Sequence, residues 1–206
     1  MRKLLAVAIL IVLPLTSCYL PDNFISEIQL GSNGDFGLTY HGDLIWAPLY
    51  RDIQRQKVTG ADIPKKIEEI RRDLARDPGF SKVESEGNAR FAVDYRREGH
   101  LKATDLATFV RRNAVVLQLH ATPDGKVTID GNTITPSQAV EATELGLNPS
   151  GEFRIITSGQ VIYHNASAVK PVGPYLLYIW TIKNAFSPAP HLVMQRDGVW
   201  PQKSQP

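Results

Sequence analysis

The stretch AVVLQLHATPDGKVTIDGNTI, residues 114–134, carries the strongest indication of β-structure in the chain. Apolar residues hold alternate positions on both sides of an Asp-Gly pair: Val115, Leu117 and Leu119 before it, Val127 and Ile129 after it. Alternation is the period of a half-buried strand, and Asp-Gly is a preferred hairpin turn. A second Asp-Gly pair at 130–131 suggests another turn. The stretch therefore predicts two antiparallel strands and a domain built on an antiparallel sheet.

Four segments outside this hairpin are expected to be helical or irregular. Thr135-Pro136 followed by Gln138 forms a capping box with proline in the first turn, so a helix is expected from 135 to 145, before Gly146. Residues 62–77 place apolar side chains every three or four positions, and their charged face is interpreted as solvated rather than as a docking surface. A short helix is expected over 47–58. Residues 104–112 are expected to form a brief helix or an irregular link.

The remaining segments alternate like strands. Residues 24–30 and 36–46 flank Asn33-Gly34 and predict a hairpin, as do the segments within 82–95. Further strands are expected at 152–157, 160–164, 174–182 and 191–195. The predicted fold class is α+β, a mostly antiparallel β-sheet with two to four helices packed on it. A single domain is expected over 24–195, with a loose C-terminal tail over 196–206.

The segment PYLLYIWTI, residues 174–182, is apolar on both faces. Leu177 and Ile179 share one face, while Tyr178 and Trp180 share the other. A strand of this kind is usually covered on both sides, and a central strand is the favoured interpretation. The alternative is that Tyr178 and Trp180 line a ligand groove for an acyl chain or a glycan, because aromatic rings offer an apolar body with a polar edge.

The N-terminus has the layout of a secretory signal, with Arg2 and Lys3 before the apolar run LLAVAILIVLPL. This run of twelve residues is shorter than the ~20 that a membrane-spanning helix needs. The following Leu-Thr-Ser-Cys resembles the bacterial lipobox, which implies diacylglyceryl on Cys18 and cleavage before it. Residues 1–17 are then a lipoprotein signal peptide, and 18–23 the lipidated cysteine and a short tether. The alternative is an ordinary signal peptide beside an incidental cysteine.

Composition narrows the function classes. Without residues 1–17, which contain Arg2 and Lys3, the 23 Lys and Arg fall to 21 and match the 21 Asp and Glu. No clustered basic face predicts nucleic-acid binding. The sequence holds neither H-E-x-x-H nor G-x-S-x-G, and its five histidines lack metal-ligand spacing, so no catalytic residue, metal or cofactor is expected. Asp35 and Asp43 are interpreted as turn and edge residues rather than as an acid pair.

Two segments together resemble the LppM-like domain of bacterial envelope lipoproteins. They are EIQLGSNGDFGLTYHGDLIW at 27–46 and GEFRIITSGQVIYHNASAV with YLLYIWTI at 151–169 and 175–182. The matching positions are Phe153, Ile155, Gly159, Val161, Asn165, Trp180 and Ile182. The resemblance implies an envelope protein, and one member of the family binds an envelope glycolipid. The sequence departs from the pattern because it has no second apolar run of membrane-spanning length.

These observations predict a lipid-anchored envelope protein whose domain is a non-enzymatic binding module. Its expected partners are the membrane, through the acyl chains on Cys18, and a lipid, a glycan or an envelope protein. Tyr19 follows the cysteine, where an aspartate would favour inner-membrane retention, so the periplasmic face of an outer membrane is expected. The alternative function is a periplasmic hydrolase, because catalytic residues can be distant in sequence.

Overall fold

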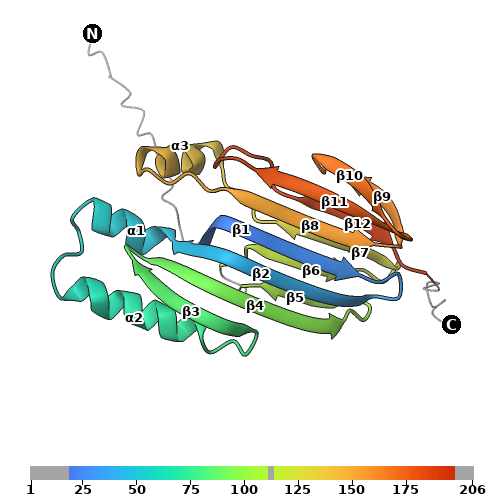
Figure 1. Ribbon diagram of the computed structural model, residues 1–206, viewed down its shortest axis with the longest axis horizontal. Coiled ribbons are helices and arrows are strands. Elements are labelled where there is room, and N and C mark those ends of the chain that lie inside the picture. The colour runs from blue at the N-terminus through green and yellow to red at the C-terminus, as the bar shows by residue number, and fades with distance from the viewer. Residues whose placement is uncertain (1–18, 111–113, 198–206) are drawn as a thin grey trace, which may run out of the picture.

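The computed structural model describes residues 19–110 and 114–197 (Figure 1). The predicted signal peptide, Cys18 and residues 198–206 of the predicted tail lie outside this range. The elements in chain order are β1 (Tyr19–Leu30), β2 (Asp35–Trp46), α1 (Ala47–Gln54), α2 (Asp62–Leu74), β3 (Phe80–Gly87), β4 (Arg90–His100), β5 (Leu106–Phe109), β6 (Leu117–Ala121), β7 (Lys126–Gly131), α3 (Pro136–Glu144), β8 (Gly151–Thr157), β9 (Gln160–His164), β10 (Ala168–Val172), β11 (Tyr175–Ile182) and β12 (His191–Gln195).

The strands form two sheets. The larger has seven strands in the order β10-β11-β8-β1-β2-β4-β3, and the smaller has five in the order β5-β6-β7-β12-β9. Neighbours are antiparallel except β1 and β8, which run parallel. The predicted hairpins β1–β2, β3–β4 and β6–β7 are all present. The predicted α+β class is therefore confirmed, with two mostly antiparallel sheets and helices.

The two sheets enclose one hydrophobic core. Buried side chains of β2 and β4, such as Leu38 and Phe91, belong to the same cluster as Leu119, Ile129 and Leu192 of the smaller sheet. Figure 1 shows the larger sheet lying in front of the smaller one. The layer that covers the predicted sheet is thus mainly a second sheet. The expectation of helices packed on one sheet is wrong on this point, because segments expected to join one sheet divide between two.

The helices gather at the end of the molecule where β1 begins (Figure 1). Helix α2 packs against this end through Ile67, Ile70 and Leu74, which confirms its predicted apolar stripe. Helix α3 begins with the predicted capping box, since Thr135 Oγ1 accepts from the Gln138 amide at 3.3 Å and Gln138 Oε1 accepts from the Thr135 amide at 2.8 Å. It packs in a second cluster with residues of β1 and β2.

Two local predictions are wrong, and one strand was not predicted. The expected link at 104–112 contains strand β5, which pairs with β6. Residues 130–131 end β7 instead of forming a second turn. Strand β10 was not expected, because Lys170 and Pro171 interrupt its apolar pattern. It lies at the edge of the larger sheet, where the missing N–H of a proline is tolerated.

Residues 19–23 belong to β1, so the tether predicted for 18–23 is wrong over these five positions. The strand contains a bulge between Asp22 and Ile25, where Asn23 and Phe24 stand opposite Gly42. The additional residue reverses which side chains face each sheet surface. Beyond it, Tyr19 pairs with Trp46 and Leu20 with Ile45. Because of the bulge, residues 19–22 do not continue the alternation of residues 24–30, so the sequence does not show that they belong to the same strand.

Candidate apolar ligand site

The predicted groove residues lie in the core. Tyr178 and Trp180 are 5% and 1% exposed and belong to the cluster between the sheets. Burial raises the pKa of the Tyr178 phenol. The ring of His164 packs edge-on at 4.9 Å from that of Tyr178. The structure therefore leaves neither aromatic face open as a groove, because the smaller sheet covers the side of β11 from which both rings project.

The indole of Trp180 has a specific polar partner. Its Nε1 donates to Asn165 Oδ1 at 2.6 Å, and the same oxygen accepts from the His191 amide at 2.8 Å. Asn165 Nδ2 donates to the Ala189 carbonyl at 2.9 Å. One asparagine side chain thus joins β11 to the segment that enters β12, across both sheets. Trp180 and Asn165 are structural residues in this arrangement.

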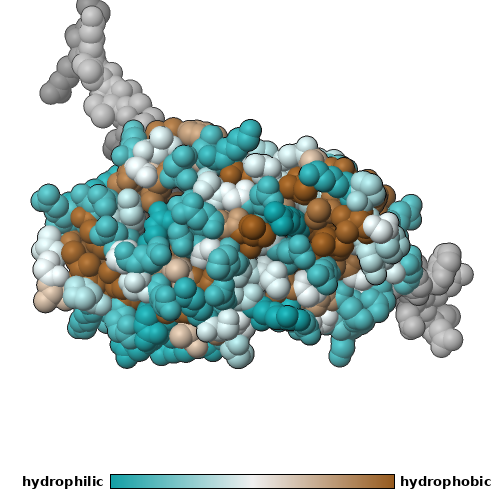
Figure 2. Space-filling view, viewed as in Figure 1, coloured by the Kyte–Doolittle hydropathy of each residue, from teal (hydrophilic) through white to brown (hydrophobic). Residues whose placement is uncertain are grey.

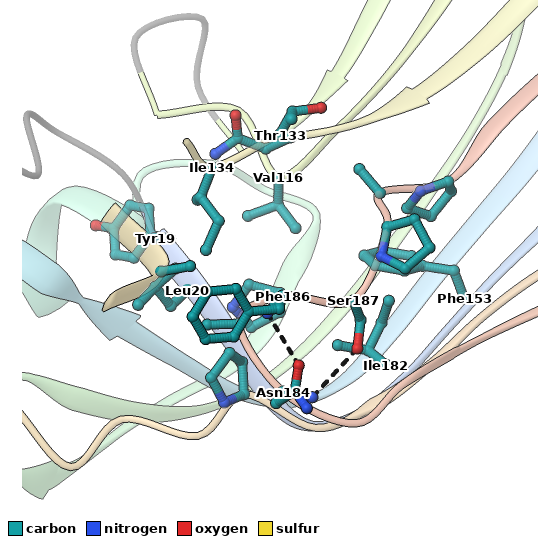
Figure 3. Close-up of a pocket in the computed structure, with 18 of the residues that line it drawn as sticks. Tyr19, Leu20, Val116, Thr133, Ile134, Phe153, Ile182, Asn184, Phe186 and Ser187 are labelled. Carbon is teal, nitrogen blue, oxygen red and sulfur yellow. Dashed lines mark hydrogen bonds between the residues drawn. The ribbon is translucent and has the colours of Figure 1, made fainter. Parts of the chain in front are cut away.

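An apolar pocket of about 350 Å³ lies at the end of the molecule where β1 begins. The start of β1, the end of β11, helix α3 and the loop between β11 and β12 surround it. We call it the apolar pocket and define it by its lining: Tyr19, Leu20, Pro21, Val116, Asn132, Thr133, Ile134, Pro136, Ala139, Pro149, Phe153, Ile182 and residues 184–190. None of these described residues is charged. Figure 3 shows the side chains of Leu20, Val116, Ile134 and Phe186 converging on its interior.

The loop at 183–190 holds an aromatic side chain over this pocket. Ser187 Oγ accepts from the amide of Lys183 at 2.9 Å. It also accepts from the amide of Asn184 at 3.2 Å, and Asn184 Oδ1 accepts from the Phe186 amide at 2.9 Å (Figure 3). These bonds fix a tight turn. The Phe186 side chain is 58% exposed although it lines the pocket. The rim of the pocket is therefore an exposed phenyl ring on a hydrogen-bonded turn.

A charged network fixes the strand that forms one wall. Arg90 Nη1 lies 2.7 Å from Asp22 Oδ2 and 2.8 Å from Asp43 Oδ2, which joins β4, β1 and β2. Asp22 Oδ1 also accepts from the Ser150 amide at 3.0 Å and from the Asn23 amide at 3.0 Å. The buried aspartate is thereby satisfied at the bulge. The network holds Leu20, two residues earlier, under α3 and against the pocket.

A second pocket of similar volume lies beside α2, and we call it the α2 pocket. Its apolar floor includes Trp46 and Ile70, and three carboxylates of the α2 region line it at four-residue spacing: Glu69, Asp73 and Asp77. Asp77 Oδ1 accepts from the Gly79 amide at 2.9 Å, and Asp73 lies 3.4 Å from Arg76. Tyr19 lines both pockets. No histidine, serine or cysteine occurs among the lining residues described for the α2 pocket.

The other titratable residues considered in the sequence are separated in space. Asp35 pairs with His100 at 2.6 Å, whereas Asp43 pairs with Arg90, so they form no acid pair. The hydrogen bond from His100 is the main reason that the pKa of Asp35 is lowered. Within residues 19–110 and 114–197, no three His, Cys, Asp or Glu side chains are grouped as metal ligands.

Apolar side chains that do not line the apolar pocket are also exposed on β9, β10 and β11. They are Ile162 and Tyr163 of β9, Val169 and Val172 of β10, and Tyr175 and Leu176 of β11. Figure 2 shows hydrophobic residues gathered over the β10–β11 end, with polar residues between them and the α-helical end.

The apolar pocket was not predicted from the sequence. Its lining comes from segments that begin at residue 19 and end at residue 190, and apolar residues at such separations form no motif. The one signal available was the group of apolar residues directly after Cys18, which the expectation of a tether passed over. Cys18 itself lies outside the described residues.

Comparison with known proteins leaves the family open. No family model matches the chain, and no curated protein matches its sequence. No helix within the described ranges is long and apolar enough to cross a membrane. One weakly similar solved structure is the NMR structure of the folded domain of the Mycobacterium tuberculosis LppM protein. The similarity covers 89% of this chain and 93% of that chain, at 10% identity and a TM-score of 0.38. Similarity at this level supports no argument about function, so membership of the LppM-like family stays a prediction.

Proposed function

We propose that this protein is a lipid-anchored bacterial envelope module that binds an apolar chain of a lipid in the apolar pocket. The observation that carries the proposal is the position of that pocket. Its wall is formed by Tyr19 and Leu20, the two residues that follow the predicted lipid attachment site. An anchor at Cys18 would hold the pocket close to the membrane surface, where lipids are the most abundant apolar ligands.

The chemistry of the lining supports an acyl chain over a glycan. Ligand sites usually combine apolar walls with a few polar groups, and here the polar groups are the neutral residues Asn132, Thr133, Asn184 and Ser187. Each methylene transferred from water to such a pocket stabilises the complex by about 0.8 kcal/mol. A sugar offers few such groups, and its hydroxyls would require more partners than this lining provides.

Binding is the proposed activity, and location on the periplasmic face of an outer membrane is part of the same proposal. The hydrolase alternative would have to use the α2 pocket, because carboxylates gather there. Two of the three are engaged in structural contacts, Asp77 with the Gly79 amide and Asp73 with Arg76. This engagement favours the binding module.

The test uses the chain from Tyr19 to Pro206 without lipid. This chain should fold, because both hydrophobic clusters are built from residues 19–194. Titration with dansyl-undecanoic acid should show saturable fluorescence enhancement that unlabelled palmitate reverses. Ile134→Asp should weaken binding tenfold or more, because an unpaired polar group in an apolar site costs ~1–3 kcal/mol and 1.4 kcal/mol is tenfold.

Ile70→Asp is the matched control, because Ile70 is a half-buried isoleucine that lines the α2 pocket. Binding by this variant should equal that of the unaltered chain. Thermal melting of all three proteins establishes that they are folded. Equal affinity of both variants, or no competition by palmitate, would contradict the proposal. Release of p-nitrophenol from p-nitrophenyl esters by the unaltered chain, abolished by Asp77→Asn, would favour the hydrolase.

A further inference from the structure

We propose that one acyl chain carried by Cys18 itself occupies the apolar pocket, so that an incoming lipid must displace the protein's own anchor chain. The inference rests on the proposed function and names its regulation. The anchor chain is a built-in competitor for the same site.

The first argument is distance. Strand β1 begins at Tyr19, and Tyr19 and Leu20 are both buried and both line the pocket. Consecutive Cα atoms are about 3.8 Å apart, so an acyl chain on Cys18 starts one residue from the pocket wall. A group tethered this closely reaches an effective concentration on the order of millimolar. A free ligand has to compete with that concentration.

The second argument is the choice between the two pockets that Tyr19 borders. The lining described for the apolar pocket contains no charged residue, whereas Glu69, Asp73 and Asp77 line the α2 pocket. An acyl chain forms no favourable polar interaction with a carboxylate. Its burial in the α2 pocket would remove water from these anions, which is energetically unfavourable. Leu20, turned under α3 by the bulge, lines only the apolar pocket. The tethered chain is therefore assigned to the apolar pocket.

The lone cysteine makes a direct test available. A thioether at Cys18 leaves the mature protein without a free thiol, so an introduced cysteine is the only one that a maleimide can label. Three single variants report three places: Ile134→Cys the apolar pocket, Ile70→Cys the α2 pocket, and Val140→Cys the exposed side of α3 beside the apolar pocket. Each is prepared as the lipidated mature protein in phosphatidylethanolamine–phosphatidylglycerol liposomes. Each is also prepared as the chain 19–206 mixed with the same liposomes.

The measurement is the rate of alkylation by a sulfonated maleimide. Lipidation should slow the reaction of Ile134→Cys tenfold or more and leave Ile70→Cys and Val140→Cys unchanged. Equal rates for Ile134→Cys in the two forms would overturn the inference. Equal slowing of Val140→Cys would also overturn it, since the bilayer would then shield this end without any chain in the pocket. Selective slowing of Ile70→Cys would assign the chain to the α2 pocket and reject the inference.

Two further results separate this inference from the proposed function. The intact mass of the mature protein must include the acyl groups, and a mass without them would remove the proposed occupant. Binding of dansyl-undecanoic acid by the unlipidated chain tests the pocket alone. If that probe binds and Ile134→Cys is not protected in the lipidated form, only the inference fails. If the probe does not bind, the proposed function fails with it.

Discussion

Replacement of Trp180 by alanine should separate a core tryptophan from a ligand-binding one. The side chain is 1% exposed and is the largest of the fully buried side chains among the described residues. Truncation of a core tryptophan to alanine costs ~3–5 kcal/mol. A domain of this kind has a total free energy of unfolding of ~5–15 kcal/mol. Trp180→Ala should therefore remove a large share of the stability while the remaining folded protein binds the probe normally.

Two milder variants divide this loss into packing and hydrogen bonding. Trp180→Phe retains an aromatic ring but removes the 2.6 Å bond to Asn165 Oδ1, at a cost of ~1–2 kcal/mol, and the smaller ring leaves a cavity that adds to this loss. Asn165→Ala also removes the bonds to the His191 amide and the Ala189 carbonyl, so it should cost more than the indole bond alone. The double variant should be less destabilised than the sum of the two, because both single variants remove the same bond.

Urea unfolding followed by far-UV circular dichroism measures these free energies without depending on indole fluorescence. Dansyl-undecanoic acid binding is measured below the unfolding transition and expressed per folded molecule. A loss under ~1 kcal/mol for Trp180→Ala, below the range for a core tryptophan, would contradict the burial argument. If probe binding were also lost, Tyr178 and Trp180 would have to be a groove after all.

Three further predictions test other parts of the chain. Cys18→Ser should leave an unprocessed precursor on immunoblots, and normal processing would refute the lipobox interpretation. Gly42→Ala should lower the free energy of unfolding by ~1–3 kcal/mol, because its φ is +143° and a Cβ would lie 2.6 Å from Phe24 Cα; an unchanged urea midpoint would refute this. The pKa of Asp124 is lowered to about 2, mainly by a hydrogen bond from Lys126, so its stabilisation is full above pH ~4 and is lost as the pH falls toward 2. Asp124→Asn should flatten acid unfolding across that window, and superimposable curves would count against it.

The hairpins could be predicted because their information is local. Alternation of apolar residues and an Asn-Gly or Asp-Gly pair both lie within about 20 residues, as in β1–β2 and β6–β7. The division into two sheets could not be predicted in the same way. It depends on pairings such as Phe24 with Gly151 and Leu192 with Ile129, between segments far apart in the chain. The apolar character of a strand does not specify its partner.

The sequence indicated single residues of the candidate sites but did not indicate what each residue does. Trp180 was singled out because it is aromatic, but a buried aromatic ring serves packing as well as binding, and the residue type does not distinguish the two. Asn165 was noted only in the resemblance, although its side chain joins β11 to the entry of β12. The apolar pocket required long-range assembly, so only the structure could reveal it.

The bulge in β1 links the fold to the proposed site. Without the additional residue opposite Gly42, the two faces of the strand before it would exchange. Tyr19 would then lie toward α3, and Leu20 would lie toward Trp46 and the core. The network of Asp22, Arg90 and Ser150 fixes the bulge in its present register. Both Tyr19 and Leu20 line the apolar pocket, and the contacts that stabilise this end of the sheet therefore decide which of them packs under α3. A change that removes the bulge should alter stability and lipid binding together, whereas Trp180→Ala should alter stability alone.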